Sequence, residues 1–578
     1  MRVPRLFYCA LYVAPVVIFV VLSIGSVAQK SPTYDETVHL FAGYSYLKWG
    51  DFRVNPEHPP LVKMLVAAPL MALNLDISGI TPRERYKVQR DKNYGWVLAH
   101  RLVFAKNDAD TLFHYARLVM VTLAVGLASW VGLWTRQLYG TQAAIVAMFL
   151  FCLDPNLIAH SAIVQTDFPF ALFFFGSTYF FWRSLDNLSW FNLLMAAALF
   201  ALAAVTKFSS VLILPIWLAL GLARIFKSDT LHAAIIDPPE ISGRWAKVAL
   251  VATVLVLSVT VAYLAIWAIY QLRFDTILFQ RGELPTGDLA IENSVSNSIL
   301  QFARDYMLLP EALLFGLGDA YQHLQRTAYL LGAISPSGFW LYFPVAFLAK
   351  TPVPTLLFIF IAAGYTLFRR PKQIAVYFLL VPPLLFFSFA IWSRFNVGWR
   401  HILPMYPFLF AWVGGTIAAL WRSGQRSTRM LLVFLGVWLC GSTLLAYPNY
   451  LAYFNEAVGG SGNGRSILVD SNLDWGQDLK ALKQWMTHNQ VDKIQFAYFG
   501  TADPAYYKID CVYLPGSVFS NSNDDAIDVL DSKPPYVAIS ETLLAGLYLD
   551  KPDYYAHFRD REPTTIIGHS IRVYKIPD

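Results

Sequence analysis

Charged residues and cysteines are both scarce in this sequence. Of its 578 residues only 15% are Asp, Glu, Lys or Arg, whereas 56% are hydrophobic and 16% are aromatic. Soluble globular proteins carry about 25% charged residues, so this composition excludes an ordinary soluble protein and indicates a membrane protein. The formal net charge of +6 is spread between apolar segments, which excludes a single basic face for nucleic acid.

The four cysteines exclude a disulfide framework. Cys9, Cys152 and Cys440 lie in or beside apolar segments, and Cys511 is alone in a polar region, so we expect no structural disulfide. No cluster of His and Cys has the spacing of a zinc site. The sequence therefore predicts no metal ligands and no certain cofactor, and leaves a divalent metal requirement open.

Long apolar runs, by contrast, recur along most of the chain. A helix needs about 20 apolar residues to cross a bilayer. Eleven runs approach that length, near residues 6–28, 117–135, 141–154, 168–182, 190–206, 208–223, 248–270, 341–368, 374–392, 402–421 and 430–447. The third and fourth runs are short and can extend into the stretch between them. We therefore predict a mainly α-helical, polytopic membrane bundle of about 11 transmembrane helices.

The basic residues indicate how these helices are oriented. With a cytoplasmic N-terminus, every second connection is also cytoplasmic, and these connections carry, among others, Arg5, Arg136, Arg183, Arg224, Arg244, Arg369 and Arg422. Lys and Arg concentrate in cytoplasmic loops, so the polar segments 29–116, 271–340 and 448–578 are predicted to lie outside. The first run ends in small residues like a signal peptide, but its length favours an uncleaved anchor.

The residues after Tyr447 have a different pattern. The segments Ser466–Ser471, Lys493–Gly500, Pro535–Ser540 and Ile566–Ile576 have the composition of strands, and Gln477–His488 has that of an amphipathic helix. We predict a membrane domain over residues 1–447 and a small α/β domain outside the membrane over residues 448–578.

Two adjacent carboxylates, Asp35 and Glu36, follow the first apolar run in the sequence Ser31-Pro32-Thr33-Tyr34-Asp35-Glu36. An acid pair at a membrane surface is costly unless it is solvated or used. Proline and threonine favour a turn into a helix, so the pair is expected at a helix N-terminus, where the dipole favours anions. The pattern predicts catalytic carboxylates, with ordinary helix capping as the alternative.

The same outer loop continues with a proline-rich turn. Glu57, His58 and Lys63 flank Pro59-Pro60, and the apolar stretch Met64–Leu73 follows. This stretch is too short to span a bilayer and predicts an interfacial helix, whose entry the prolines stiffen. The three polar residues are therefore expected beside Asp35 at headgroup depth, with a hydrated loop as the alternative.

Further polar residues lie at the predicted outer ends of spans. They are His160, Asp167 at the head of the fourth span, Lys207 at the turn of an apolar hairpin, and Arg400 with His401 before the tenth span. Each has a structural alternative: a helix cap for the acid, headgroup contact for the cations and packing for the histidines. Because outer loops are depleted in cations, their presence together predicts binding of a lipid phosphate.

These motifs carry a family resemblance. They are Tyr34-Asp35-Glu36, the turn Glu57 to Leu61, the segment His160 to Asp167, Thr206-Lys207 and the segment Trp399 to Pro404. They resemble the bacterial members of glycosyltransferase family 39, relatives of the protein O-mannosyltransferases and of the lipid A aminoarabinose transferase. The resemblance covers most of the membrane part, and the tail motif Val469 to Asp478 is similar to one in other bacterial members. It implies a GT-C fold, inversion at the anomeric carbon and a multi-pass protein of the bacterial inner (plasma) membrane.

The resemblance also implies the reaction. The donor would be a polyprenyl-phosphate-linked sugar, and the acceptor a hydroxyl group of a protein, lipid or glycan. Asp35 is the expected base, since the hydroxyl must lose its proton, Glu36 would orient the acceptor or the base, and Asp167 would fix a cation or a sugar hydroxyl. The residues expected at the donor phosphate are Lys207, Arg400, Lys63 and His401, with His58, Glu57 and His160 in support. No β-trefoil insertion lies between Leu272 and Phe339, which argues against a protein acceptor.

Two other functions fit parts of this pattern. A transporter or flippase is the main alternative, since many spans with intramembrane charge also describe a carrier. Carriers usually place ionisable groups near the midplane and repeat their halves, whereas here the charges gather at the outer ends and no repeat is found. A non-catalytic assembly protein that holds an envelope partner through its tail is a third interpretation.

Overall fold

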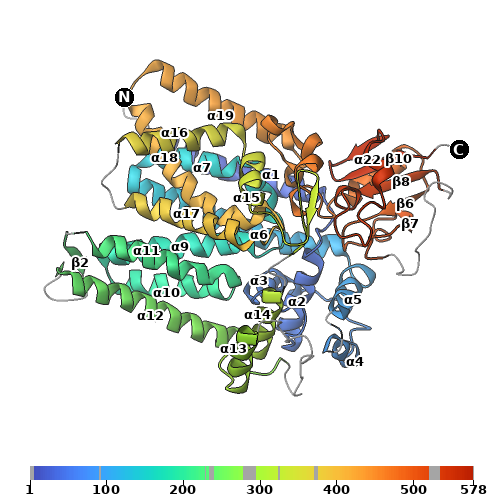
Figure 1. Ribbon diagram of the computed structural model, residues 1–578, viewed down its shortest axis with the longest axis horizontal. Helices are drawn as coiled ribbons and strands as arrows, with labels where there is room; N and C mark the ends of the chain where they lie inside the picture. The colour runs from blue at the N-terminus through green and yellow to red at the C-terminus, as the bar shows by residue number, and fades with distance from the viewer. Residues whose placement is uncertain are drawn as a thin grey trace.

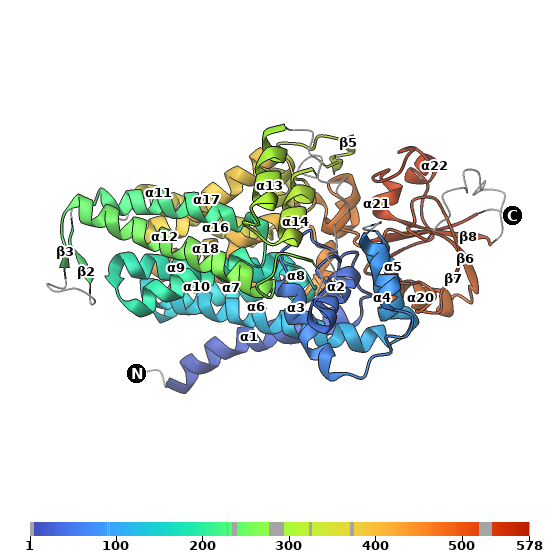
Figure 2. The same ribbon diagram turned by 90° about the horizontal axis from the view of Figure 1, so that it is seen from below.

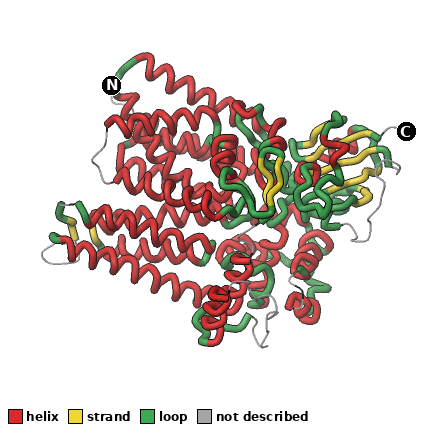
Figure 3. Tube along the Cα trace, in the orientation of Figure 1, coloured by secondary structure: helices red, strands yellow, loops and turns green. Residues whose placement is uncertain are grey.

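Helices make up most of the molecule. The computed structural model describes residues 5–89, 91, 93–227, 229–233, 240–276, 294–322, 326–369, 375–519 and 534–576. The helices run side by side in an elongated body, and the largest sheet lies at the end opposite to the N-terminus (Figure 1). Figure 3 shows the strands gathered at that end, apart from short strands elsewhere.

The helices of the membrane body follow the apolar runs of the sequence. They are α1 (Arg5–Ala28), α6 (Ala109–Tyr139), α7 (Thr141–Cys152), α8 (Pro155–Ala162), α9 (Asp167–Asp186), α10 (Trp190–Ala204), η4 (Phe208–Leu212), α11 (Ile213–Ile225), α12 (Arg244–Ile269), α15 (Tyr342–Lys350), α16 (Val353–Arg369), α17 (Ala375–Ser393), η6 (Trp399–Met405), α18 (Tyr406–Arg422) and α19 (Arg426–Ala446). Short strands β1 (Asn187–Leu188), β2 (Leu231–Ala233) and β3 (Glu240–Ile241) lie at the ends of α9, α11 and α12.

The described residues contain seven helices long and apolar enough to cross a membrane, and two bent pairs raise this number to nine. The charged residues in α9 lower its mean hydropathy, and α10 has only 15 residues. With these two helices included, the elements account for the eleven predicted runs. The prediction of a mainly helical, polytopic membrane protein is confirmed.

The predicted span 341–368 is wrong as one continuous helix. The chain bends by 110° between α15 and α16. Pro352 lies at this break and disfavours helical geometry in the residue before it. The Lys350 ammonium donates to the carbonyl oxygens of Leu451 at 2.8 Å and Asn472 at 2.5 Å. Lys350 therefore binds the end of α15 to the tail. The hydropathy of the run 341–368 does not indicate this contact.

A second bend separates α7 from α8. The two helices meet at 68°, where the Asp154 carboxylate accepts hydrogen bonds from the backbone N–H groups of Asn156 at 2.9 Å and Leu157 at 3.1 Å. Asp154 thus caps a new helix. The short third run extends into the following stretch as expected, but in a new direction.

The segment 29–116, which is predicted to lie outside, folds into short helices beside the membrane body. They are α2 (Glu36–Trp49), α3 (Leu61–Ala67), η1 (Ala68–Ala72), α4 (Pro82–Tyr86), η2 (Lys87–Gln89), α5 (Tyr94–His100) and η3 (Arg101–Ala105). The predicted interfacial helix at Met64–Leu73 corresponds to α3 and η1. A side chain at Gly43 of α2 would overlap the carbonyl oxygen of Lys63, so glycine allows α2 to pack closely on α3.

The segment 271–340, also predicted to lie outside, is described in part. It contains α13 (Ser294–Asp305), α14 (Glu311–Gln322) and a hairpin of β4 (Ala328–Leu330) and β5 (Ala333–Ser335). Residues 277–293 and 323–325 of the predicted loop 271–340 lie outside the described residues. Figure 2 shows α13 and α14 at the same side of the molecule as α2 and α3.

The tail forms the predicted α/β structure. Its strands are β6 (Lys493–Ala497), β7 (Asp510–Tyr513), β8 (Tyr536–Ser540), β9 (Thr565–Ile567) and β10 (Ile571–Lys575), in the sheet order β7-β6-β8-β10-β9. β6 is parallel to β7 and β8, and β10 is antiparallel to β8 and β9. Its helices are α20 (Leu479–His488), α21 (Glu541–Leu544) and α22 (Ala556–Arg559). On α20, Leu479, Leu482 and Met486 are buried, as the amphipathic pattern predicted.

The predicted strand at Ser466–Ser471 is wrong. Residues 450–472 form short 3-10 turns, η7 (Tyr450–Ala452), η8 (Glu456–Val458), η9 (Ser461–Ser466) and η10 (Asp470–Asn472). The glycine-rich sequence before Ser466 favours turns, and Asp470 has a left-handed φ of 59°, outside the extended range of a regular strand. The exact domain boundary after Tyr447 stays a prediction.

Candidate active site

Asp35 lies at the start of α2 with its side chain partly open to solvent. It occupies the N-cap position, yet its side chain makes no capping hydrogen bond. The carboxylate is 28% exposed and lies 3.3 Å from Nη1 of Arg400. Helix capping therefore does not account for Asp35, and its carboxylate is accessible to a substrate.

Asp167, Lys207 and Arg400 come together from three separate membrane segments. Asp167 begins α9, Lys207 lies between α10 and η4, and Arg400 lies in η6. Lys207 pairs with one carboxylate oxygen of Asp167, and Arg400 Nη1 lies 3.9 Å from the other. Because the same nitrogen contacts Asp35, one guanidinium links the two carboxylates.

The tail holds Arg400 in place. The guanidinium lies 4.2 Å from the centre of the Trp475 ring, a cation–π contact. The backbone N–H of Tyr34 donates to the Trp475 carbonyl oxygen at 2.9 Å. One tail residue therefore positions both Arg400 and the loop that carries Asp35.

Three buried nitrogen atoms at this cluster have no hydrogen-bond partner among the described residues. They are Nε of Arg400, Nε2 of His401 and Nδ1 of His58. His401 follows Arg400 in η6, and the His58 ring lies 6.2 Å from the ring of Phe208, the residue after Lys207. Buried polar groups in folded proteins are nearly always hydrogen-bonded. Such a group of unpaired nitrogens next to two cations is typical of a site that receives an anion.

Lys63 lies beside this cluster and is bonded to its own loop. Its side chain is buried, and its ammonium donates to the carbonyl oxygens of Asn55 and of His58, the latter at 3.1 Å. Burial lowers the pKa of Lys63 to about 7, although the charges of Glu57 and Asp35 oppose this shift. Lys63 thus stabilises the turn that carries Glu57 and His58. The His58 ring in turn lies near Phe208, the residue after Lys207.

Glu36 does not join the cluster. Its carboxylate has no exposed surface and pairs with Arg117, whose Nη2 and Nε lie at 2.8 and 3.0 Å. It also accepts from the backbone N–H groups of Thr33 at 2.7 Å and Val164 at 3.1 Å. Burial raises its pKa, but Arg117 and these hydrogen bonds outweigh burial and hold the pKa below its usual value. Both oxygens of Glu36 are occupied, so a direct contact with the acceptor, one of the two expected roles, is wrong, and the orientation of the base stays a prediction.

His160 is a buried packing residue next to η6. Its ring stacks on Trp399 with centroids 5.8 Å apart and planes at 13°. Its Nδ1 lies 3.0 Å from the amide nitrogen of Gln165. His160 thus contacts the residue before Arg400, and its supporting role stays a prediction.

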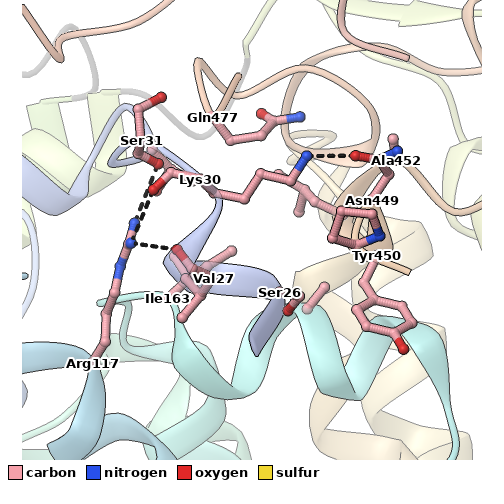
Figure 4. A pocket seen from close by; sticks show the side chains of 14 residues that line it. Ser26, Val27, Lys30, Ser31, Arg117, Ile163, Asn449, Tyr450, Ala452 and Gln477 are labelled. Atoms are coloured by element: carbon pink, nitrogen blue, oxygen red, sulfur yellow. Dashed lines mark hydrogen bonds between the residues drawn. The ribbon is translucent and has the colours of Figure 1, made fainter. Parts of the chain in front are cut away.

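The tail also binds the loop between α1 and α2. The Ser31 N–H donates to the Gln477 carbonyl oxygen at 2.9 Å, and the Lys30 ammonium pairs with Asp478 at 2.5 Å. Figure 4 shows Lys30, Ser31, Arg117 and Gln477 around a pocket at this junction. The described lining of the pocket does not include Asp35 or Arg400.

No arrangement of three or more His, Cys, Asp or Glu residues that could hold a metal ion occurs in the part of the chain that the structure describes. Cys152, Cys440 and Cys511 are free thiols.

Sequence reasoning missed three residues that shape the site. Arg117 lies at the edge of the second apolar run. A cation at that place could have been predicted to pair with Asp35 or Glu36. Trp475 lies in a tail motif that no sequence pattern placed near the membrane. Arg326, whose charge acts on Asp35 and Glu57, carried no signal in the sequence.

Comparison with known proteins gives one family match. Residues 95–236 match the family model described as dolichyl-phosphate-mannose-protein mannosyltransferase. No curated protein matches the chain. The solved structure of ArnT from Cupriavidus metallidurans bound to undecaprenyl phosphate is 11% identical, with 99% of this chain and 98% of that chain covered and a TM-score of 0.47. The Archaeoglobus fulgidus oligosaccharyltransferase in complex with Zn and sulfate is 14% identical, with 86% and 57% covered and a TM-score of 0.42. The family match confirms the predicted resemblance to the protein mannosyltransferase class of membrane glycosyltransferases.

Proposed function

We propose that this chain transfers a sugar from a polyprenyl-phosphate donor to an acceptor hydroxyl, with inversion at the anomeric carbon. The observation that carries the proposal is the set of unpaired nitrogens on Arg400, His401 and His58 beside Lys207. Asp35, the accessible carboxylate, lies 3.3 Å from Arg400. The guanidinium of Arg400 thus belongs to the proposed anion-binding site and also contacts the proposed base. The reaction needs both an anion-binding group and a base at one site.

The phosphate side of the site stabilises the leaving group. As the bond between C1 of the sugar and the phosphate oxygen breaks, the electron pair stays on that oxygen and its negative charge grows. Lys207 and Arg400 supply two positive charges, and unpaired nitrogens of His58 and His401 can supply hydrogen bonds. Preorganised donors of this kind contribute most where water is excluded. The leaving lipid phosphate is weakly basic, so no protonating acid is required, unlike in a glycoside hydrolase.

Asp35 supplies the base. The acceptor oxygen forms its bond to C1 on the face opposite to the departing phosphate, and its proton passes to the Asp35 carboxylate. Arg400 Nη1 contacts both Asp35 and Asp167, so it fixes the position of the base relative to the cations that receive the phosphate. Asp167 is assigned to holding Lys207 and Arg400 in place through its two oxygens.

We place the site on the non-cytoplasmic side of a bacterial inner (plasma) membrane, with the N-terminus in the cytoplasm. The N-terminus and the tail lie at opposite ends of the molecule (Figure 1). At the end away from the tail, Arg224 and Lys227 pair with Asp229, which fits the cytoplasmic, basic side of the orientation rule. Residues 1–447 are the proposed catalytic membrane domain, and residues 448–578 the extracytoplasmic domain.

The test offers the purified full chain a panel of polyprenyl-phosphate sugars, with and without a divalent metal, and measures hydrolysis and transfer. We expect one donor class to turn over, and Asp35→Asn to lower turnover by about 10²–10⁴-fold while the protein still binds polyprenyl phosphate. Asp110→Asn is the matched control, because Asp110 is an outer-surface acid, 48% exposed and paired with Lys480. Equal turnover by wild type and Asp35→Asn would contradict Asp35 as the base. Movement of an intact lipid across vesicles without cleavage would contradict a transferase.

A further inference from the structure

A loop of the tail, residues 469–478, contacts the two membrane segments that carry the site. Its first part is bonded to residues 397–399, directly before Arg400. Its second part is bonded to residues 31–34, directly before Asp35. Neither the proposed base nor a proposed phosphate-binding residue belongs to this tail loop. Its contacts with both segments therefore indicate a role other than binding substrate.

Asn472 of the tail loop caps the short helix η6. The first N–H groups of a helix have no partner within the helix, and Asn472 Oδ1 accepts a hydrogen bond from the Trp399 N–H at 2.8 Å. The Nδ2 atom donates to the Tyr342 hydroxyl at 2.8 Å and to the Val469 carbonyl oxygen at 3.0 Å. Asn472 has no exposed surface, so water cannot replace these bonds. A tail side chain therefore fixes the start of η6, one residue before Arg400.

Ser471 binds the same segment from the neighbouring position. Its hydroxyl donates to the Val397 carbonyl oxygen at 2.7 Å. A side chain at Gly398 would overlap this hydroxyl, so glycine allows the tail loop to approach closely. Two successive tail residues thus hold three successive residues of the segment that leads into Arg400.

The second part of the tail loop holds the turn before Asp35. The Tyr34 N–H donates to the Trp475 carbonyl oxygen at 2.9 Å. The Ser31 hydroxyl, which has no exposed surface, donates to the Gly476 carbonyl oxygen at 3.0 Å. These bonds fix the backbone of the turn on the side of the tail.

The two parts of the tail loop are braced against each other. Gln477 Oε1 accepts from the Trp475 N–H at 2.7 Å, and Gln477 Nε2 donates to the Leu473 carbonyl oxygen at 3.0 Å. Asn472 and Trp475 are three residues apart, which is at most about 11 Å of chain. The anchors of the two membrane segments thus belong to one short, braced stretch of the tail.

We infer that Asn472 is a positioning residue for the transfer reaction, and that the tail loop sets the separation between Arg400 and Asp35. The inference rests on the proposed function. Asn472 acts through the backbone of Trp399 on the guanidinium that receives the phosphate, and it touches neither donor nor acceptor. A misplacement of about 1 Å can lower a rate about 10²-fold, so the bond that fixes the start of η6 contributes to kcat.

The alternative role for Asn472 is attachment of the tail to the membrane body, without an effect on the site. Asn455 provides a matched control for this alternative. It is also a buried tail asparagine, and its Nδ2 donates to the carbonyl oxygens of Leu348 at 2.6 Å and Thr351 at 2.8 Å. Asn455 thus binds the tail to the bend between α15 and α16 instead of to η6.

The experiment measures thermal unfolding of the full chain in detergent, and its steady-state transfer from the polyprenyl-phosphate sugar that it cleaves. Asn472→Ala and Asn455→Ala should both lower the unfolding temperature, since each removes buried hydrogen bonds. Only Asn472→Ala should lower kcat, by about 10- to 100-fold, with the KM for the acceptor unchanged. Ser471→Ala should lower kcat to a smaller extent, and it provides the comparison if Asn472→Ala does not fold.

A double-variant cycle separates positioning from stability. If Asn472 acts through Arg400, its effect depends on the guanidinium being present. In the Arg400→Lys background, Asn472→Ala or Ser471→Ala should therefore lower kcat by less than about threefold. Effects that are independent of Arg400 would multiply instead.

The outcomes distinguish this inference from the proposed function. An unchanged kcat in the loop variants, an equal loss of kcat in Asn455→Ala, or multiplying effects in the cycle would each overturn the positioning role and leave the transferase assignment intact. If wild type cleaves no donor, the transferase assignment fails and the positioning role fails with it. A loss of kcat confined to the loop variants, and absent in the Arg400→Lys background, supports both.

Discussion

Substitution of Glu36, which pairs with Arg117, tests whether this carboxylate stabilises the structure or acts on the substrate. Glu36→Gln keeps the size of the side chain but replaces one carboxylate oxygen with an amide nitrogen. Both oxygens now accept hydrogen bonds, from Arg117, Thr33 and Val164. The amide nitrogen would therefore face another donor, and the Arg117 cation would be left buried without a counter-charge.

The expected cost follows from this geometry. Glu36 has no exposed side-chain surface, and that of Arg117 is 8% exposed, so water cannot replace the lost partner. Removal of one partner of a buried ion pair lowers the free energy of unfolding by about 3–5 kcal/mol. Glu84→Gln is the control, because its pairs with Lys87 and Arg101 are partly exposed and such pairs contribute about 0–1 kcal/mol.

The assay is thermal unfolding of the detergent-purified chain, followed by tryptophan fluorescence. Glu36→Gln and Arg117→Met should each unfold at a clearly lower temperature than wild type and Glu84→Gln. The double variant should lose less than the sum of the two, with a coupling of about 1–3 kcal/mol. If Glu36→Gln unfolds at the wild-type temperature and yet abolishes transfer, the carboxylate acts on the substrate and the structural assignment is refuted.

Three further predictions concern the site. Arg400→Lys keeps the charge but cannot contact Asp35 and Asp167 together, so kcat should fall about 10²-fold in steady-state transfer assays; an unchanged kcat would contradict the shared guanidinium. Trp475→Leu removes the ring beneath Arg400 and should lower kcat about tenfold with partial rescue by Trp475→Phe, whereas equal loss in both variants would indicate a packing role alone. Burial holds the pKa of Lys63 at about 7, below the value of about 10.4 in an unfolded chain. The folded chain therefore binds fewer protons between these pH values, and stability rises with pH across that window. In Lys63→Met the melting temperature should rise less steeply with pH across this window. An equal slope in wild type and Lys63→Met would contradict this prediction.

The positions of the membrane helices could be predicted because they depend on local composition. A run of about 20 apolar residues has few alternatives in a bilayer, and each predicted run overlaps a helix or a bent pair. The break in the run 341–368 could not be read from hydropathy. It depends on Lys350 reaching Leu451 and Asn472, about a hundred residues further along the chain, and on the proline between α15 and α16.

The composition of the site could be predicted, but its internal pairing could not. Lys207 and Arg400 stood out because cations are disfavoured at the outer end of spans. Which acid faces which cation depends on packing between segments far apart in sequence. The tail adds Trp475 to this packing, through a cation–π contact and a backbone hydrogen bond, neither of which leaves a periodic pattern. The sequence therefore indicates the kinds of residue at the site better than their partners.

The adjacent acids Asp35 and Glu36 show why neighbours in sequence can have separate roles. Asp35 has helical dihedral angles, φ −80° and ψ −21°, and Glu36 begins α2. Successive residues of a helix point about 100° apart, so two adjacent side chains at a helix start can have different partners. One carboxylate faces Arg400 and solvent, and the other turns inward to Arg117. The pair therefore divides into one accessible carboxylate, which is the proposed base, and one buried carboxylate that holds the turn through Arg117 and the backbone of Thr33 and Val164.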